Sequence, residues 1–434
     1  MEIIKKSIFG ILTLLTLHQH WATCKVPDNI DVLDEWWTTF SESWPRYHQT
    51  TQIIHQMAET LPKNVQIYSI GKTVQKREMW VIKLGSDLTK KRSFLVPQMK
   101  LVANMHGDET LGRALLLMFA VDVLTKYQKG YRRAIDLLKN TEIHLLYSMN
   151  TDGFEATPEG ECSPDPDILG RCNANLADLN RDFPDQFVDS GDTFEELLEG
   201  RQPETQNVMK WIVANYFVLS ANLHALSLVA SYPFDSVSLK LEKDPRYKGA
   251  GVISRSPDHD FFFTLATMYA TTHEFMSIEN NCTEGEFPNG VTNGAEWYNV
   301  RGGMQDFNYI HSNTFDITFE LSCCKFPPKE TLLGEWEANR EALWKYVEAT
   351  HWGIKGLVQD EEGNPIDGAT IHVDGINHTV YTTPQGEYWR LLVPGKSYTV
   401  WAEADGYKAS EERDVVVHQK VKVAERYDFT LKEV

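Results

Sequence analysis

The strongest constraint on the fold is the alternation of short apolar segments with helical ones between residues 40 and 349. Runs rich in β-branched and aromatic residues predict strands at Asn64–Ile70, Glu78–Leu84, Lys100–Asn104, Glu142–Tyr147, Val218–Leu223 and Thr314–Leu321. Helical patterns occupy 40–62, Thr110–Lys126, Pro203–Ala214 and Glu335–Ala349. Strands that alternate with helices favour an α/β fold with a mixed, mostly parallel sheet flanked by helices.

The pattern changes after Gly353. Residues 354–434 alternate apolar and polar side chains, as at Ile371 and Val373, with turn signals such as Pro384-Gln385-Gly386 and no helical period. This predicts a small all-β sandwich of roughly 80 residues, near the lower size for such a domain. We therefore expect an α/β domain at 25–352 and a β-sandwich domain at 353–434.

The N-terminus predicts export. Lys5 and Lys6 precede the apolar run Ser7–Leu17, and small residues follow up to Cys24, which is typical of a signal peptide at 1–24. No later apolar run approaches membrane length, so we expect a secreted, soluble chain without a membrane anchor. The formal charge of -19 argues against nucleic-acid binding, and we expect a monomer.

The cysteines fit an oxidising compartment. Removal of Cys24 leaves five, which gives two bridges and one leftover thiol without fixing the connectivity. Adjacent Cys323 and Cys324 cannot readily pair with each other, so each should take a different partner. Sequons that begin at Asn281 and Asn377 predict N-glycosylation on exposed loops.

A metal site is indicated where the strand at Lys100–Asn104 ends in His106-Gly107-Asp108-Glu109. An imidazole and a carboxylate three positions apart on such a turn can converge on one divalent ion. Histidine plus carboxylate, without thiolate, suits zinc. His224 ends another apolar strand and offers a further imidazole. Alone, it would more often be a core histidine bonded to backbone.

Two further features suit hydrolysis. Glu320 interrupts a strand that otherwise reads as buried, and burial raises the pKa of a carboxylate toward the neutral range that a general base needs. Asn180 and Arg181 place an amide beside a guanidinium, which can clamp a carboxylate. Taken alone, Glu320 could be a structural carboxylate paired with an arginine, and Asn180-Arg181 an ordinary polar loop. The hypothesis of a hydrolytic site therefore rests on their combination with the metal motif.

In these segments the chain resembles the zinc metallocarboxypeptidases of the carboxypeptidase N/E/M/D type. The matching pieces are Asn104-Met105-His106-Gly107-Asp108-Glu109, Asp178-Leu179-Asn180-Arg181, Leu228–Asp235, Asn293–Tyr298, Gly302–Tyr309 and Glu320–Pro327. With the segment Tyr68–Lys72 they cover nearly all of residues 45–350 in the family's order. The tail resembles the transthyretin-like domain that follows the catalytic domain in this subfamily.

The resemblance implies one zinc ion per chain, held by His106, Glu109 and His224. The fourth position then holds the attacking water, whose pKa zinc lowers to roughly 7. By the same resemblance, Glu320 deprotonates this water and later passes the proton to the leaving amine.

The resemblance also assigns a substrate pocket. Arg171, nine positions before Asn180, corresponds to the arginine that polarises the carbonyl and stabilises the oxyanion. Asn180 and Arg181 would bind the terminal carboxylate, which makes the enzyme an exopeptidase. Tyr298 matches the mobile tyrosine that closes over the C-terminal residue.

Asp235 and Gln305 bear on specificity. Asp235 lies eleven positions after His224, where this subfamily places the acid that meets a terminal Lys or Arg, and Gln305 resembles a second polar residue of that pocket. The expected substrates are therefore peptides or proteins with a basic C-terminal residue.

The resemblance assigns the two bridges to four cysteines, Cys162, Cys282, Cys323 and Cys324, and leaves Cys172 odd. The chain departs from the family at Ala225-Leu226, where two glycines usually follow the histidine ligand, and at Thr151, where proline is usual. Added side chains beside a ligand can narrow the cleft or shift the backbone.

Three alternatives remain. One is a catalytically weak or inactive peptide-binding member of the same fold, although no ligand, base or clamp residue is missing from the sequence. Another is an enzyme with an apolar or acidic terminal preference, against which Asp235 argues. A third is a β-sandwich domain that recruits a partner rather than serving stability.

Overall fold

The computed structural model describes residues 30–160, 162, 169–189, 191–278, 282, 287–419 and 422–434. The expected signal peptide at 1–24 and the sequon asparagine Asn281 lie outside these described residues. Within the described ranges, no helix is both long enough and apolar enough to cross a membrane.

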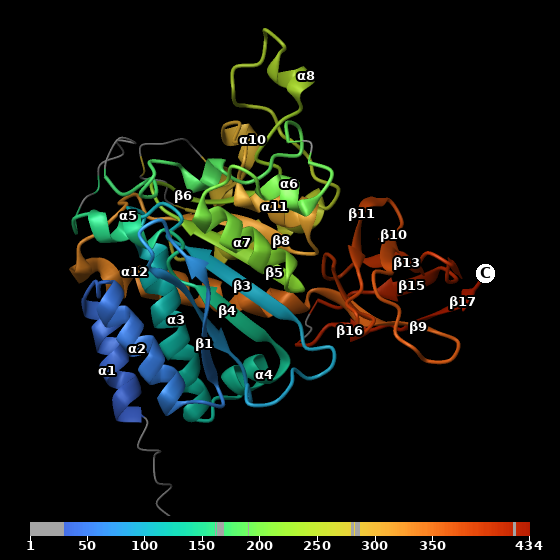
Figure 1. The fold of residues 1–434 in the computed structure, drawn as a ribbon, viewed down its shortest axis with the longest axis horizontal. Helices are drawn as coiled ribbons and strands as arrows, with labels where there is room; N and C mark the ends of the chain where they lie inside the picture. Colours follow the sequence, from blue (N-terminus) through green and yellow to red (C-terminus); the bar gives the residue numbers. More distant parts are fainter. Residues whose placement is uncertain are drawn as a thin grey trace, which may run out of the picture.

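The first domain is built on an eight-stranded mixed sheet in the order β1-β2-β4-β3-β5-β8-β6-β7 (Figure 1). Its strands are β1 (Val65–Lys72), β2 (Glu78–Leu84), β3 (Gln98–Ala103), β4 (Glu142–Leu146), β5 (Phe217–His224), β6 (Leu228–Tyr232), β7 (Val291–Asn293) and β8 (Phe315–Leu321). The central strands β4, β3, β5 and β8 run parallel. The pairs β1–β2, β2–β4 and β6–β8 are antiparallel, and the edge strand β7 pairs parallel with β6. The expected mixed sheet is confirmed.

Helices cover both faces of this sheet. They are α1 (Ile30–Glu42), α2 (Tyr47–Thr60), α3 (Leu111–Gln128), α4 (Arg132–Asn140), α5 (Thr151–Ala156), α6 (Phe194–Leu198), α7 (Pro203–Val213), α8 (Leu239–Glu242), α9 (His259–Thr272), α10 (Gly294–Trp297), α11 (Met304–His311) and α12 (Leu332–Glu348). Apolar residues of α3, α9 and α12 join one buried cluster, while residues of α7 join a second. Burial on both faces explains why the central strands read as continuous apolar runs.

Two helix expectations were wrong. The helix predicted at 40–62 is two helices, because Pro45 between α1 and α2 lacks an amide hydrogen and disfavours helical backbone before it. Helix α9 was not predicted at all. Its sequence is apolar on most sides, and periodicity alone cannot distinguish such a segment from a buried strand.

The C-terminal domain is entirely β, as expected, and lies at one side of the first domain (Figure 1). Its strands are β9 (Gly353–Asp360), β10 (Thr370–Val373), β11 (Ile376–Tyr381), β12 (Glu387–Leu391), β13 (Ser397–Glu403), β14 (Tyr407–Lys408), β15 (Arg413–Val416), β16 (Glu425–Arg426) and β17 (Phe429–Glu433). One sheet has the order β11-β10-β13-β15, and the second has β12-β9-β17-β14 with β16 also on β9.

Two disulfides link Cys162 to Cys324 and Cys282 to Cys323. The adjacent cysteines therefore bind different partners, as their positions required. Cys172 is a free thiol.

Candidate active site

The turn that follows β3 is held by the side chain of Asn104. Its Nδ2 donates to the carbonyl oxygens of His106 and Gly107, both at 2.9 Å, and of Glu109 at 3.1 Å. Asn104 has φ 58°, a left-handed conformation that asparagine tolerates better than most residues. A side chain at position 107 would meet the backbone of Gly153 at 2.4 Å, so only glycine fits there. This turn aims His106 and Glu109 in one direction.

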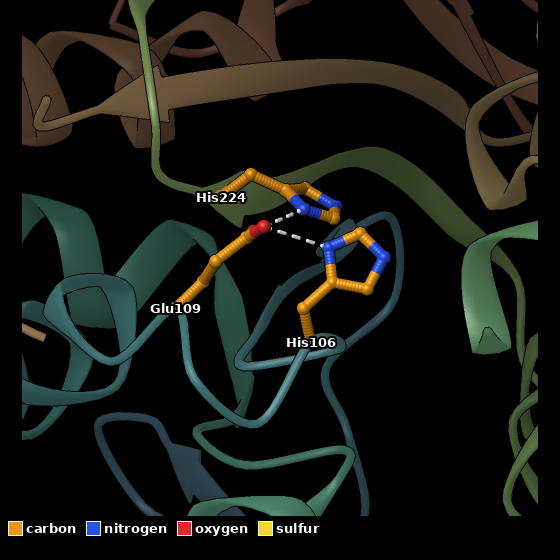
Figure 2. A group of neighbouring side chains, drawn as sticks. All are labelled: His106, Glu109 and His224. Atoms are coloured by element: carbon orange, nitrogen blue, oxygen red, sulfur yellow. Dashed lines mark hydrogen bonds and ion pairs between the residues drawn. The ribbon is translucent and has the colours of Figure 1, made fainter. Parts of the chain in front are cut away.

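His106, Glu109 and His224 form one buried group of candidate metal ligands, which we call the metal cluster. Their candidate ligand atoms all lie within 4.8 Å of one another (Figure 2). Nδ1 of His106 lies 2.9 Å from Glu109 Oε1, and Nδ1 of His224 lies 2.7 Å from Oε2. Although burial opposes it, the two imidazoles hold the pKa of Glu109 well below its usual range. Two imidazole nitrogens and a carboxylate, without a thiolate, fit zinc.

Strand register brings the other pieces to the same edge. In the parallel pair β5 and β8, His224 lies directly opposite Glu320, and Ala103 at the end of β3 lies opposite Leu223. The metal cluster and Glu320 therefore share the carboxyl edge of the parallel strands, the usual location of sites in such sheets. Glu320 is only 8% exposed.

Asp178 is a site residue that sequence reasoning missed. Its Oδ1 lies 2.9 Å from His106 Nε2, and its Oδ2 accepts from Arg171 Nη2 at 2.8 Å. A carboxylate on the outer nitrogen of a metal-binding histidine fixes the ring orientation and raises its basicity. Asp178 also accepts from the backbone N–H of Asn180, so in the sequence it reads as an ordinary helix cap.

Arg171 lies beside the metal cluster, as the resemblance implied. Its Nη1 is 3.3 Å from Glu109 Oε1 and 3.2 Å from His106 Nδ1. Burial disfavours the charge, but Glu109 and Asp178 outweigh it and raise the pKa of Arg171 above its usual value. Arg171 therefore stays cationic beside Glu109 and His106.

Asn180 and Arg181 are held in different ways. Asn180 Oδ1 accepts from the backbone N–H of Met304 at 3.1 Å, which fixes the orientation of the amide. Arg181 is exposed, and its Nη1 donates to the carbonyl oxygen of Asn180. Tyr298 follows α10 and is 40% exposed, so its ring is not locked into the core.

Asp235 is buried at 7% exposure and is fixed by two neighbours on α11. Gln305 Oε1 accepts from Thr318 N at 2.6 Å, which leaves its Nε2 to donate to Asp235 Oδ1 at 2.7 Å. Asp306 accepts from the backbone N–H of Asp235 at 3.0 Å. Burial, and then the charge of Asp306, raise the pKa of Asp235 well above its usual value.

Gly303 lies between Asp235 and the carboxylate clamp. A methyl group at Gly303 would lie 3.3 Å from Asp235 Oδ2 and 3.7 Å from Asn180 Oδ1. Asp235 Oδ2 and Asn180 Oδ1 therefore lie on either side of the position that a side chain at residue 303 would occupy.

Ala225 and Leu226 stand where the family usually has two glycines, and Leu226 adopts a backbone conformation that suits glycine. Leu226 has φ 101°, a region that side chains make costly. Ala225 donates its backbone N–H to Glu109 Oε2 at 3.2 Å, and Leu226 donates to the carbonyl oxygen of Ser322 at 2.7 Å. The added side chains have not displaced this segment from the metal cluster.

Two imidazoles and a carboxylate, buried at the edge of an α/β sheet beside a further carboxylate, define a metal-dependent enzyme centre. A family model described as zinc carboxypeptidase matches residues 50–342, and one described as carboxypeptidase regulatory-like domain matches 353–432. The chain therefore belongs to the zinc carboxypeptidase family, whose members are zinc-dependent hydrolases.

Relatives agree with this assignment. The mouse carboxypeptidase N catalytic chain is 41% identical over 379 residues, which cover 83% of this chain and 80% of that protein. Rat carboxypeptidase D is 42% identical over 85% of this chain, but the match spans only 27% of its own length. Bovine thrombin-activatable fibrinolysis inhibitor, solved with a tick carboxypeptidase inhibitor, has the same fold with a TM-score of 0.54 and 20% identity. That match covers 72% of this chain and 99% of the bovine one.

Proposed function

We propose that this chain is an exopeptidase that hydrolyses the last peptide bond of peptides or proteins with a C-terminal Lys or Arg. The observation that carries this proposal is the position of Asp235, a buried carboxylate that lies near Asn180, with Gly303 between them. If Asn180 and Arg181 bind the terminal carboxylate of the substrate, the side chain of its C-terminal residue would point toward Asp235. A guanidinium or ammonium group compensates a buried anion, whereas an apolar side chain leaves it unpaired.

The proposed roles follow from the geometry. Zinc held by His106, Glu109 and His224 would act as a Lewis acid and would lower the pKa of water. Glu320, opposite His224 in the sheet, accepts the proton of the attacking water and delivers it to the leaving amine. Arg171, cationic beside the cluster, stabilises the developing oxyanion, a role worth roughly 3–4 kcal/mol in comparable sites.

Other residues bind and position the substrate. Asn180 and Arg181 bind its terminal carboxylate through charge-assisted hydrogen bonds. Tyr298 closes over the C-terminal residue, and Gln305 orients Asp235 through the bond at 2.7 Å. Asp178 keeps the His106 ring in place through the bond at 2.9 Å.

We further propose a secreted monomer with a catalytic domain at 25–352 and a β-sandwich domain at 353–434. Two disulfides support an oxidising compartment, and the N-terminal pattern of residues 1–24 supports export. Asn377 is exposed on β11, which is compatible with glycosylation there.

A catalytically weak peptide-binding protein is the second candidate function. The observation that favours it is Leu226, a residue in a costly conformation close to the metal cluster. The presence of every expected ligand, base and clamp residue in the site supports the enzyme instead.

The deciding experiment compares matched peptides that end in Arg, Lys, Ala and Phe, with and without a zinc chelator. We expect chelator-sensitive cleavage that prefers Arg and Lys. Glu320→Gln should abolish turnover while zinc content stays unchanged. Preference for Phe, or cleavage that survives the chelator, would refute the proposal, and peptide binding without turnover would support the second candidate.

A further inference from the structure

A buried polar network joins the β-sandwich domain to the first domain. Arg390 of β12 donates from Nη2 to Asp258 Oδ1 at 2.8 Å, and both residues are buried. The hydroxyl of Tyr309 donates to the other oxygen of Asp258 at 2.8 Å. The ring of His378, from β11, stacks on Tyr309 with ring centroids 3.9 Å apart. Tyr309 thus contacts the second domain directly through His378 and indirectly through Asp258, which Arg390 binds.

Tyr309 belongs to α11, and other residues of this helix form hydrogen bonds with Asp235. Gln305 and Asp306, in the first turn of α11, contact the side chain and the backbone of Asp235. Tyr309 comes four residues after Gln305, so the two lie about one helical turn apart on adjacent positions of the same side. Helix α11 has eight residues, and its backbone hydrogen bonds connect the turn that carries Gln305 to the turn that carries Tyr309.

We propose that the β-sandwich domain is a positioning element of the substrate pocket, in which Arg390 and His378 act through Tyr309 and α11 on Asp235. The inference deepens the proposed basic specificity and rests on it. Arg390 and His378 are positioning residues, since neither touches Asp235.

The charges explain why this contact is firm. Asp258 is buried in the docked interface, where the Arg390 guanidinium compensates its charge at 2.8 Å, so the two groups must stay in register while the domains are docked. The docked position of α11 is therefore well defined. A small displacement of α11 would lengthen the 2.7 Å bond from Gln305 to Asp235 and weaken selection for a cation. The three candidate zinc ligands lie outside α11, in the turn after β3 and at the end of β5.

The test uses the full chain carrying Tyr309→Phe, which keeps the stacked ring and removes the hydroxyl. The lost bonds are the one that the hydroxyl donates to Asp258 Oδ2 at 2.8 Å and the one that it accepts from the Asp258 backbone N–H at 3.3 Å. We expect the ratio of kcat/KM for an Arg-ending peptide over its Ala-ending match to fall roughly 3- to 10-fold. The change should lie mainly in KM for the Arg peptide, with zinc content unchanged. His378→Ala, which removes the stacked ring instead, should lower the ratio in the same direction.

Lys355→Met is the matched control. It removes another bond between the domains, from Lys355 Nζ to the carbonyl oxygen of Leu95 at 2.9 Å, which does not involve α11. The Arg-to-Ala ratio of this variant should equal that of the wild type.

The outcomes separate the two proposals. A wild-type ratio near 1 refutes the basic specificity and, with it, the coupling. A high wild-type ratio that neither Tyr309→Phe nor His378→Ala lowers refutes the coupling alone. An equal loss in Lys355→Met also refutes it, because general loosening of the domain contact would then explain the effect.

Discussion

Replacement of Leu226 by glycine and by alanine tests whether the segment beside the metal cluster is strained. At most positions glycine is less stable than alanine by about 0.4–1 kcal/mol, because it loses more backbone entropy on folding. At φ 101° alanine keeps the steric cost, about 1–3 kcal/mol, and glycine does not. The order should therefore invert, with Leu226→Gly more stable than Leu226→Ala by about 0.5–2 kcal/mol.

The assay is denaturant unfolding of both variants, with and without zinc, analysed at equal slope. Both variants lose the half-buried leucine side chain, so this loss cancels when the free energy of unfolding of Leu226→Gly is compared with that of Leu226→Ala. Ala225→Gly is the control, since Ala225 has no positive φ, and it should destabilise the protein by at least about 0.5 kcal/mol. A Leu226→Ala variant as stable as Leu226→Gly would contradict the strain argument.

Three further predictions follow from the site and its surroundings. Asp235→Asn should lower kcat/KM for Arg-ending peptides by about 100-fold and leave Ala-ending peptides unchanged; equal losses on both would disprove an electrostatic role. Asp178→Asn should weaken zinc binding about 10- to 100-fold in chelator competition, whereas Asp244→Asn, a half-buried carboxylate paired with Arg246, should not. Burial, helped by Lys355, lowers the pKa of His351 from 6.5 to about 3, so below pH 6.5 the unfolded chain binds a proton that the folded protein does not. Stability should fall by about 1.5 kcal/mol for this group between pH 6.5 and 5. His351→Gln, which can still bond Thr141 and Ala424, should flatten that acid limb; an unchanged limb would exclude His351 as its cause.

The sequence predicted the α/β architecture and the β-sandwich because burial patterns of strands and helices are local. The pattern of the turn indicated His106 and Glu109 as half of a metal site, and the family resemblance implied His224 as the third ligand; the structure brings the three together. Helix α9 escaped prediction since an apolar helix lacks a polar face to mark it.

The tertiary structure decided what depends on segments far apart in the chain. It paired Cys162 with Cys324, placed Asp178 on His106, and brought Gly303 between Asp235 and Asn180. It also joined Arg390 to Asp258 across 132 positions. A sequence pattern records which residue types are present and how each segment buries its apolar side. Side chains far apart in the chain come within a few ångströms only when strand register and loop closure are fixed. The sequence could therefore indicate the residues that carry the chemistry, but not the contacts that hold them in place.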